Sequence, residues 1–267
     1  MENKRKNQVK SPAEIAQGYI KVAQEKTKLS WYKLLILAVL AGAFIAFGAA
    51  CATAAGAYAT NTALVKGLVF PVGLILVVVC GAELFTGNCL LISPAIGKDI
   101  KVGGLFKNWG IVYAGNFLGG LLIAVLVVYS HVQNQTVAAA CVATAELKSN
   151  MGFGDALLRG ILCNMLVCLA VWAAMSSSTT AGKIFAVYLP VLAFVVCGFE
   201  HSVANMYYLS AGLMEHMVYP AFAAEGLSVG NALLYCLLPS TIGNIIGGCM
   251  IGVAYHTVYR TKMPKAE

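Results

Sequence analysis

The sequence predicts an all-α integral membrane protein in which six transmembrane helices form a 3+3 inverted repeat with two broken helices. Three observations lead to this fold class: the chain is strongly apolar, its polar residues separate long apolar runs, and two motifs recur in the same order. Hydrophobic residues make up 60% of the 267 residues and charged residues 11%, with a mean hydropathy of +0.79. These values lie outside the range of soluble globular domains.

Six apolar runs are long enough to cross about 30 Å of hydrocarbon, a distance that takes roughly 20 helical residues. They define a membrane domain over residues 31–258, between an N-terminal segment over residues 1–30 and a tail over residues 259–267. The N-terminal segment is polar and basic and has no apolar core, so we expect no cleavable signal peptide. The predicted spans are Trp31–Tyr58, Leu64–Ile96, Phe106–Tyr129, Ala156–Met175, Ile184–Leu213 and Ala232–Val258.

The basic residues give the expected orientation. Eight of the 18 Lys and Arg residues precede or begin the first span, and seven more lie on the same side of the predicted membrane. Only Lys66, Lys148 and Arg159 fall on the other side. By the positive-inside rule, both termini lie in the cytoplasm of a multi-pass protein of the cell (inner) membrane. No recognition module accompanies the basic residues, so they do not indicate a nucleic-acid partner.

Two short motifs occur twice and in the same order. Gly81–Asn88 and Gly198–Asn205 both read GxExxxxN, and Gly115–Gly120 and Gly243–Gly248 both read GNxxGG. The first three spans and the last three therefore resemble two copies of one unit, and an odd number of spans turns the second copy upside down in the membrane. Chance matches of small residues are the alternative. The two units run over about residues 31–130 and 156–258.

The second and fifth spans are too long and too interrupted for single straight helices, so each is expected to be two half-helices joined by a break. Irregular backbone at membrane depth is tolerated only where protein buries it or where it lines a cavity. The breaks should therefore meet near the midplane and border a pathway, and their half-helix N-termini favour an anion.

Glu83 and Glu200 occupy matching positions in the two breaks, and Asn88 and Asn205 end the two motifs. A carboxylate in hydrocarbon costs about 2.5–3.5 kcal/mol on insertion scales, so these two require a reason. We expect a scaffold role in which each carboxylate accepts hydrogen bonds from unpaired backbone N–H groups of its break. A proton relay is the alternative.

The two copies differ at the residues best suited to contact a solute. His201 lies in the second break where Leu84 stands in the first, and Thr86 corresponds to Val203. Because an imidazole can titrate near physiological pH and hydrogen-bond an anion, we expect His201 to act on the solute, with capping of the broken helix as the alternative. Lys148 lies in a polar outer loop, where it either concentrates anions at the entrance or is an ordinary solvated lysine.

An amphipathic helix is expected before the first span, over Ser11–Lys28. Ser11 suits the N-cap, Pro12 suits the first helical position and Glu14 completes a capping box. One stripe of the helix is apolar and the rest is charged, so the helix is either an interfacial anchor or a gating or subunit-contact element. The expected apolar stripe consists of Ile15, Tyr19, Ile20 and Ala23.

No pattern in the chain indicates catalysis or a cofactor. The nine Cys residues form no CxxC pair and no Cys/His cluster, so they are expected to be buried thiols rather than disulfides or metal ligands. His131, His216 and His256 lie near span ends without partners at metal spacing. Hydrolase, zinc-protease and nucleotide-binding motifs are absent. We therefore expect a protein that is not an enzyme and needs no metal or cofactor.

Five segments, located in the second to sixth spans, resemble the formate/nitrite transporter family, and the resemblance extends through all six spans. This resemblance implies a homopentamer of aquaporin-like protomers in the lipid bilayer, each with its own pore for small monovalent anions of weak acids: formate, nitrite or hydrosulfide. Within the family, Thr86–Leu91 is most similar to the hydrosulfide channel branch. The five segments are Gly81–Asn88, Lys107–Asn116, Gly160–Trp172, Gly198–Met206 and Gly243–Gly247.

The same resemblance implies roles for individual residues. His201 matches a central His between two hydrophobic constrictions, and Thr86 matches the loop Thr that pairs with it. The Ser11–Lys28 helix matches a segment proposed to gate the pore. The other matches are Phe70, Leu74 and Phe194 in the outer constriction, Leu84 and Val167 in the inner one, Asn164 and Asn244 as pore Asn residues, Lys148 as the vestibule Lys, and Glu200 as the Glu beside the His.

An apolar constriction poses a physical problem for an anion, because a bare anion loses its hydration there at high cost whereas a neutral acid loses far less. We therefore expect Lys148 to attract the anion and a proton shared near His201 and Thr86 to neutralise it during passage. The main alternative is a proton-coupled alternating-access transporter of formate or nitrite, since inverted repeats and broken helices serve both. A neutral-solute pore lacks support because neither break carries Asn-Pro-Ala, and a structural scaffold leaves the paired carboxylates unexplained.

Overall fold

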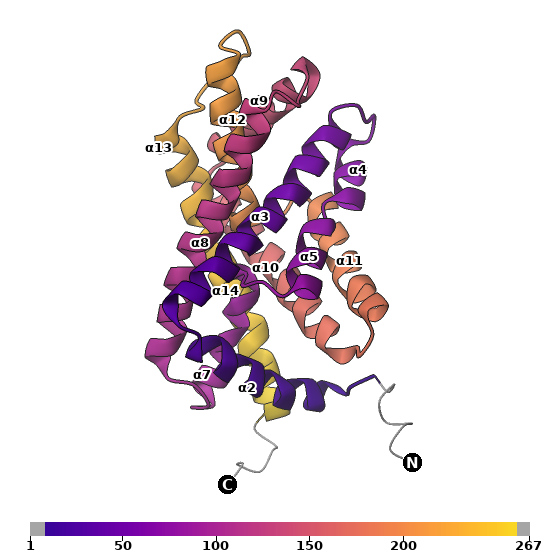
Figure 1. Ribbon diagram of the computed structural model, residues 1–267, viewed down its shortest axis with the longest axis vertical. Helices are drawn as coiled ribbons and strands as arrows, with labels where there is room; N and C mark the ends of the chain where they lie inside the picture. The colour runs from indigo at the N-terminus through magenta and orange to yellow at the C-terminus, as the bar shows by residue number, and fades with distance from the viewer. Residues whose placement is uncertain (1–8, 261–267) are drawn as a thin grey trace.

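The structure is a computed structural model that describes residues 9–260, and this part of the chain is helical with irregular connections. Most helices run roughly along one long axis, and α2 (Pro12–Lys28) lies across one end of the bundle (Figure 1). We call this end, where α2 contacts His256–Arg260, the terminal face, and we call the opposite end the distal face.

Five helical stretches of the described chain are long and apolar enough to cross a membrane. Three of them are single helices: α3 (Trp31–Gly56), α8 (Val102–Tyr129) and α10 (Phe153–Ser176). A fourth is a continuous stretch of consecutive elements near the C-terminus, namely α13 (Val229–Asn231), η2 (Ala232–Leu237), α14 (Leu238–Tyr255) and η3 (His256–Arg260). The fifth is Thr62–Cys80 in the second predicted span. The remaining predicted span has no helix of sufficient length, because it is broken near its middle.

Both expected breaks are present, which confirms the broken-helix prediction. The second span contains α4 (Thr62–Val69), α5 (Val72–Cys80), α6 (Phe85–Asn88), η1 (Cys89–Leu91) and α7 (Ile92–Ile96), and the fifth contains α11 (Thr180–Val196) and α12 (Ser202–Val218). The half-helices end at Gly81 and Gly198, whose φ angles of 79° and 69° lie in the left-handed region that glycine adopts without a Cβ penalty. A further joint at Phe70–Pro71, between α4 and α5, was not predicted.

The two halves of the chain pack alike, as an inverted repeat requires. α3 packs on α8 in the first half, and α10 packs on α14 in the second. The GNxxGG motifs are at these contacts: a Cβ on Gly119 would overlap the Val39 carbonyl oxygen, and one on Gly247 would overlap the Ile161 carbonyl oxygen. These glycines therefore allow backbone contact between helices, which is the packing role expected for small residues in membrane helices.

Gly119→Ala is expected to destabilise the protein by about 1–3 kcal/mol, the usual cost of overpacking a tight contact. Gly110→Ala in the same helix is the matched control, because no atom lies within 4 Å of the Cβ it would add. Alanine is also the better helix former, so the control is expected to be neutral or slightly stabilising. Unfolding by increasing SDS, followed by circular dichroism, measures both; equal stability of the two variants would contradict the packing role.

α2 confirms the predicted N-terminal helix and its capping box. The Ser11 hydroxyl accepts a hydrogen bond from the Glu14 backbone N–H, and the Ser11 N–H donates to the Glu14 carboxylate at 2.8 Å. These bonds hold the pKa of Glu14 below its ordinary value. Ile15, Tyr19 and Ala23 of the expected stripe are buried together with Ala16, whereas Ile20 is half-buried. The helix is thus docked on the bundle by its apolar face.

The segment after the third span differs from expectation, because the polar outer loop is a helix, α9 (Gln135–Ser149). It is rich in alanine, and the Asn134 side chain caps it by accepting a hydrogen bond from the Val137 N–H. α9 packs on α12, with Gly212 of α12 against Cys141 and Ala145. Local helix propensity and this packing make the segment regular.

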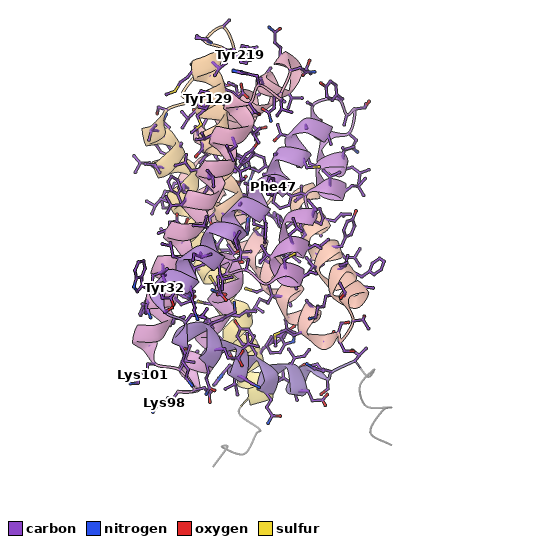
Figure 2. The ribbon with its side chains drawn as sticks, in the orientation of Figure 1. Tyr32, Phe47, Lys98, Lys101, Tyr129 and Tyr219 are labelled. Atoms are coloured by element: carbon purple, nitrogen blue, oxygen red, sulfur yellow. The ribbon has the colours of Figure 1, made fainter. Side chains whose placement is uncertain are left out.

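The exposed side chains mark the two ends of the bundle. Figure 2 shows Tyr129 and Tyr219 near the distal face, Phe47 midway, and Lys98 and Lys101 at the edge of the terminal face. Large exposed apolar side chains cover the length between them, Phe47 being 48% exposed. Aromatic residues near a membrane surface and basic residues beyond one end are the pattern expected for a multi-pass membrane protein.

Candidate functional site

The two breaks meet at the centre of the molecule through one side-chain contact. Nε2 of His201, at the start of α12, lies 2.9 Å from Oγ1 of Thr86, in α6. The two residues are 115 positions apart in the chain. Thr86 is fully buried and His201 is 4% exposed. The half-helices of the two repeats therefore join at Thr86 and His201, which lie at two of the positions where the repeats differ.

The hydrogen bonds around His201 define which nitrogen carries the proton in the neutral ring. Nδ1 accepts a hydrogen bond from the Ala204 backbone N–H at 3.2 Å and so caps α12. With Nδ1 as an acceptor, the proton is on Nε2, which donates to the Thr86 oxygen. The Thr86 hydroxyl then has its own proton to donate elsewhere. The His201 ring thus caps α12 and contacts Thr86, while its expected action on a solute stays a prediction.

Two Asn residues from the GNxxGG motifs hold the breaks. The Asn244 side chain accepts from the Ser202 N–H at 2.8 Å and donates to the carbonyls of Glu200 at 2.9 Å and Gly160 at 2.8 Å. Asn116 does the same in the first repeat, accepting from the Phe85 N–H at 2.9 Å and donating to the carbonyls of Glu83 at 3.0 Å and Ala38 at 2.7 Å. Sequence reasoning missed Asn116, although its motif repeats that of Asn244.

The two carboxylates brace the breaks through side chains rather than backbone, which corrects the expected form of the scaffold. Glu200 receives hydrogen bonds from Lys148 at 2.6 Å and Asn205 at 2.8 Å, a group that we call the distal triad. Glu83 receives hydrogen bonds from Lys26 and Asn88, both at 2.7 Å, and these form the terminal triad. The physical reason is that the Asn244 and Asn116 amides already accept from the backbone N–H groups of the breaks.

The ion pairs of the triads are largely removed from solvent. The Lys148 and Glu200 side chains are 13% and 5% exposed, and those of Lys26 and Glu83 are 20% and 8% exposed. Burial disfavours the Lys148 ammonium, but the adjacent Glu200 carboxylate more than compensates and holds the pKa of Lys148 above its ordinary value. Lys148 is therefore neither in a loop nor an ordinary solvated lysine. Lys26 was not predicted, because it reaches Glu83 only after α2 docks.

One cavity opens toward each face. The distal cavity, of about 210 Å³, is bordered by His201, and the terminal cavity is about 500 Å³. Basic side chains line both: Lys66, Lys148 and Arg159 in the distal cavity, and Lys10, Lys26 and Lys183 in the terminal cavity. Each cavity also contains the carboxylate of its triad.

Aromatic rings separate the distal cavity from the centre. The Phe70 and Phe194 rings meet edge to face with centroids 5.8 Å apart, and Phe194 stacks on the His201 ring at 5.9 Å. Phe70 and Phe194 both line the distal cavity, and their role as an outer constriction stays a prediction. Leu74, expected with them, lines the terminal cavity with Leu84 instead, because it lies in α5, beyond the joint at Phe70–Pro71.

The remaining expected pore residues lie behind the cavity walls. Val167 is 1% exposed and packs in the core, and it borders neither cavity. Asn164 donates to the carbonyls of Thr86 at 3.1 Å and Asn244 at 2.6 Å, so it links the two breaks. In this structure Asn164 and Asn244 position the central pair and do not line the cavities.

The inverted repeat, the two broken helices and the polar contact between two cavities define a multi-pass membrane transport protein of aquaporin-like architecture. The family model described as "Formate/nitrite transporter" matches residues 13–258, nearly the whole described chain. The chain therefore belongs to the formate/nitrite transporter family, whose members are transport proteins and not enzymes.

Similar proteins agree with this assignment. The chain is 37% identical over 264 residues to the uncharacterized transporter YrhG of Bacillus subtilis, covering 95% of both chains. It is 39% identical over 246 residues to the formate channel FocA of Escherichia coli K12, covering 85% of this chain and 86% of that one.

Solved structures show the same architecture. A pentameric formate channel with formate bound is 30% identical, with a TM-score of 0.76 over 86% of this chain and 98% of that one. An aquaglyceroporin from Plasmodium falciparum shares only the fold, at 16% identity, with a TM-score of 0.53 over 86% of this chain and 97% of that one.

Proposed function

We propose that this chain forms a homopentameric channel in the cell membrane for small monovalent anions of weak acids. The observation that carries the proposal is the His201–Thr86 contact, a polar pair placed between two cavities with basic linings. The names of the relatives support formate as a solute, and one of the similar structures is a pentamer with formate bound. The Thr86–Leu91 segment supports hydrosulfide as the first candidate, with nitrite as the third.

The proposed orientation places the terminal face in the cytoplasm. Lys98 and Lys101 lie at the edge of this face, and most basic residues of the sequence are on the same side. The distal cavity then faces outward and the terminal cavity faces inward. α2 covers part of the terminal cavity, which Tyr19 and Lys26 line, so a movement of α2 would change access to it.

In the proposed mechanism the anion crosses the apolar segments as a neutral acid. It enters the distal cavity with water, meets the His201 ring in the cavity wall, and takes up a proton there through the His201–Thr86 contact. The neutral acid passes the rings of Phe70 and Phe194 on one side of the His201–Thr86 pair and the side chains of Leu74 and Leu84 on the other side. It then releases the proton in the terminal cavity. The proton comes from solvent through the imidazole. A doubly protonated His201 would lose its bond from the Ala204 N–H, so the proton stays there only briefly.

Replacing His201 by Phe is expected to abolish pH-dependent flux while keeping the ring contact with Phe194. Uptake of formate, nitrite and hydrosulfide into proteoliposomes is measured at several pH values for the wild type and for His201→Phe. His216→Phe, near the distal end of α12, is the control for loss of an imidazole elsewhere. Unchanged flux and selectivity in His201→Phe would contradict the mechanism, and absence of flux of all three anions in the wild type would contradict the function.

A proton-coupled alternating-access transporter is the second candidate. The observation that favours it is that the His201–Thr86 contact and the surrounding rings separate the two cavities, as alternating access also requires. Conductance of single molecules in a planar bilayer is expected for the channel. Saturable flux with a fixed proton-to-anion stoichiometry and no conductance would establish the transporter instead.

A further inference from the structure

We propose that Lys66 and Arg159 collect anions in the distal cavity, and that Lys148, the basic residue expected to do so, serves mainly to hold the helix break. The inference rests on the proposed function, since it concerns the anions that this cavity would admit. It assigns the electrostatic attraction to two residues that neither the motifs nor the resemblance identified.

The charges of the cavity wall do not cancel. Three cationic side chains and the Glu200 carboxylate line it. The Lys148 ammonium lies 2.6 Å from Glu200, so these two charges compensate each other at close range. Within residues 9–260, neither Lys66 nor Arg159 forms an ion pair. The field that a hydrated anion meets in this cavity therefore comes from Lys66 and Arg159.

The positions of the two side chains suit collection at the mouth of the cavity. Lys66 precedes Phe70 by four residues along α4, so it lies above the ring that closes the cavity floor. Its stem rests against Gly56 of α3, where an added Cβ would lie 2.7 Å from the Lys66 Cε. Arg159 belongs to α10, and its carbonyl accepts from the Glu200 N–H at 3.3 Å. The two cations thus flank the break from different helices.

The distribution of charge along the chain supports the same assignment. The positive-inside pattern leaves only Lys66, Lys148 and Arg159 on the distal side, and all three line this one cavity. They come from α4, α9 and α10, which are separate in sequence. Basic residues placed only to set topology would not need to converge. A focused positive field in a cleft raises the local concentration of anions, and salt screens it.

The size of the cavity indicates the state of the ligand. A volume of about 210 Å³ corresponds to roughly seven water molecules at their share of liquid volume. A small monovalent anion can therefore occupy the cavity with part of its hydration shell and leave it quickly. The site is expected to bind weakly and to favour charge over shape.

Formate uptake from the distal side tests the proposal. The double variant Lys66→Gln/Arg159→Gln is expected to raise the formate concentration for half-maximal uptake by about five- to ten-fold, with a maximal rate within two-fold of wild type. Its uptake should lose most of its dependence on ionic strength. Lys66→Arg keeps the charge and should behave as wild type, and Lys33→Gln, on an exposed part of α3 remote from the cavity lining, controls for net charge.

Lys148→Met/Glu200→Leu provides the opposing comparison, because it removes the paired charges and leaves the unpaired charges of Lys66 and Arg159. It is expected to lower the maximal rate but to keep the ionic-strength dependence. If it abolishes that dependence while Lys66→Gln/Arg159→Gln retains it, Lys148 is the collecting residue and the proposal is wrong.

A readout that needs no transport separates this inference from the proposed function. Thr144 also lines the distal cavity, so Thr144→Cys can be labelled there by anionic and cationic methanethiosulfonate reagents, against the parent chain as background. The ratio of anionic to cationic labelling rates is expected to fall about ten-fold in the Lys66→Gln/Arg159→Gln background. An unchanged ratio overturns the inference even if formate flux is normal. Absence of flux with a changed ratio would count against the proposed function alone.

Discussion

Glu200→Gln is expected to destabilise the protein by about 3–5 kcal/mol, the cost of leaving one partner of a buried ion pair without its countercharge. The Lys148 side chain is only 13% exposed, and its ammonium has no other carboxylate within reach among the described residues. The glutamine would keep the shape of the side chain. The loss therefore comes from the charge and not from a cavity.

Thermal unfolding in detergent, followed by a thiol-reactive fluorescent dye, measures this loss. The buried Cys163 and Cys236 are suitable reporters, because both are free thiols that become accessible on unfolding. Glu25→Gln, on the exposed face of α2, makes the same chemical change in solvent and is expected to shift stability by less than about 0.5 kcal/mol.

Removing both charges gives the decisive comparison. Lys148→Met/Glu200→Leu leaves no buried ion, so it is expected to recover most of the stability that Glu200→Gln loses. Asn205 keeps its second partner, the Ser240 hydroxyl, in that variant. If the double variant is as unstable as the single one, the carboxylate matters through Asn205 and the backbone rather than through Lys148.

The terminal triad should respond less to the same change. Glu83→Gln leaves Lys26, which lies on α2 and is 20% exposed, and this side chain can turn to solvent when its partner is lost. An ion pair that can separate without burying a charge contributes less than a fixed one. The two triads thus have similar geometry, but the ion pair of the distal triad is expected to contribute more to the stability of the protein.

Much of the fold could be predicted because membrane constraints act locally. Hydropathy located the crossings, and positive φ angles at Gly81 and Gly198 confirm that the helices break where the GxExxxxN motifs begin. The recurrence of two motifs in the same order was sufficient to predict the inverted repeat. These features depend on the cost of unpaired polar groups in hydrocarbon, which is the same in any fold of this kind.

The contacts within the site were harder to predict because they join distant segments. Lys26 reaches Glu83 across 57 residues, and Lys148 reaches Glu200 across 52. No local pattern indicates which of many lysines will lie beside a given carboxylate. Which cavity Leu74 lines likewise depends on the joint at Phe70–Pro71, and the uninterrupted apolar run there showed no sign of a joint.

Asn244→Leu is expected to destabilise the protein by an amount similar to loss of the distal carboxylate. The change removes one acceptor and two donors, and it leaves the Ser202 N–H and the Glu200 carbonyl unpaired in the interior, whereas the Gly160 carbonyl keeps its bond within α10. Each buried unsatisfied group costs about 1–3 kcal/mol, so the sum is roughly 2 kcal/mol or more. Leucine is branched like asparagine but larger, so overpacking adds to the loss of hydrogen bonding at this buried position.

The symmetry of the repeats makes this expectation sharper. Asn116→Leu would leave the Phe85 N–H and the Glu83 carbonyl unpaired, which are the corresponding groups in the other half, and the Ala38 carbonyl keeps its bond within α3. The two variants should therefore lose similar stability in the dye-based unfolding assay. Asn231→Leu, which changes a half-buried residue at the end of α13 whose side chain donates to the Gly226 carbonyl, is the control for adding an apolar side chain.

Function should distinguish the two halves where stability does not. Asn244→Leu releases the start of α12, which carries His201 and its bond from the Ala204 N–H, so the central imidazole loses its fixed orientation. Asn116→Leu releases the start of α6 and so displaces Thr86. Both should abolish pH-dependent flux. Near-normal stability and flux in either variant would show that the Asn side chains are not what holds the breaks, and that the carboxylate triads suffice.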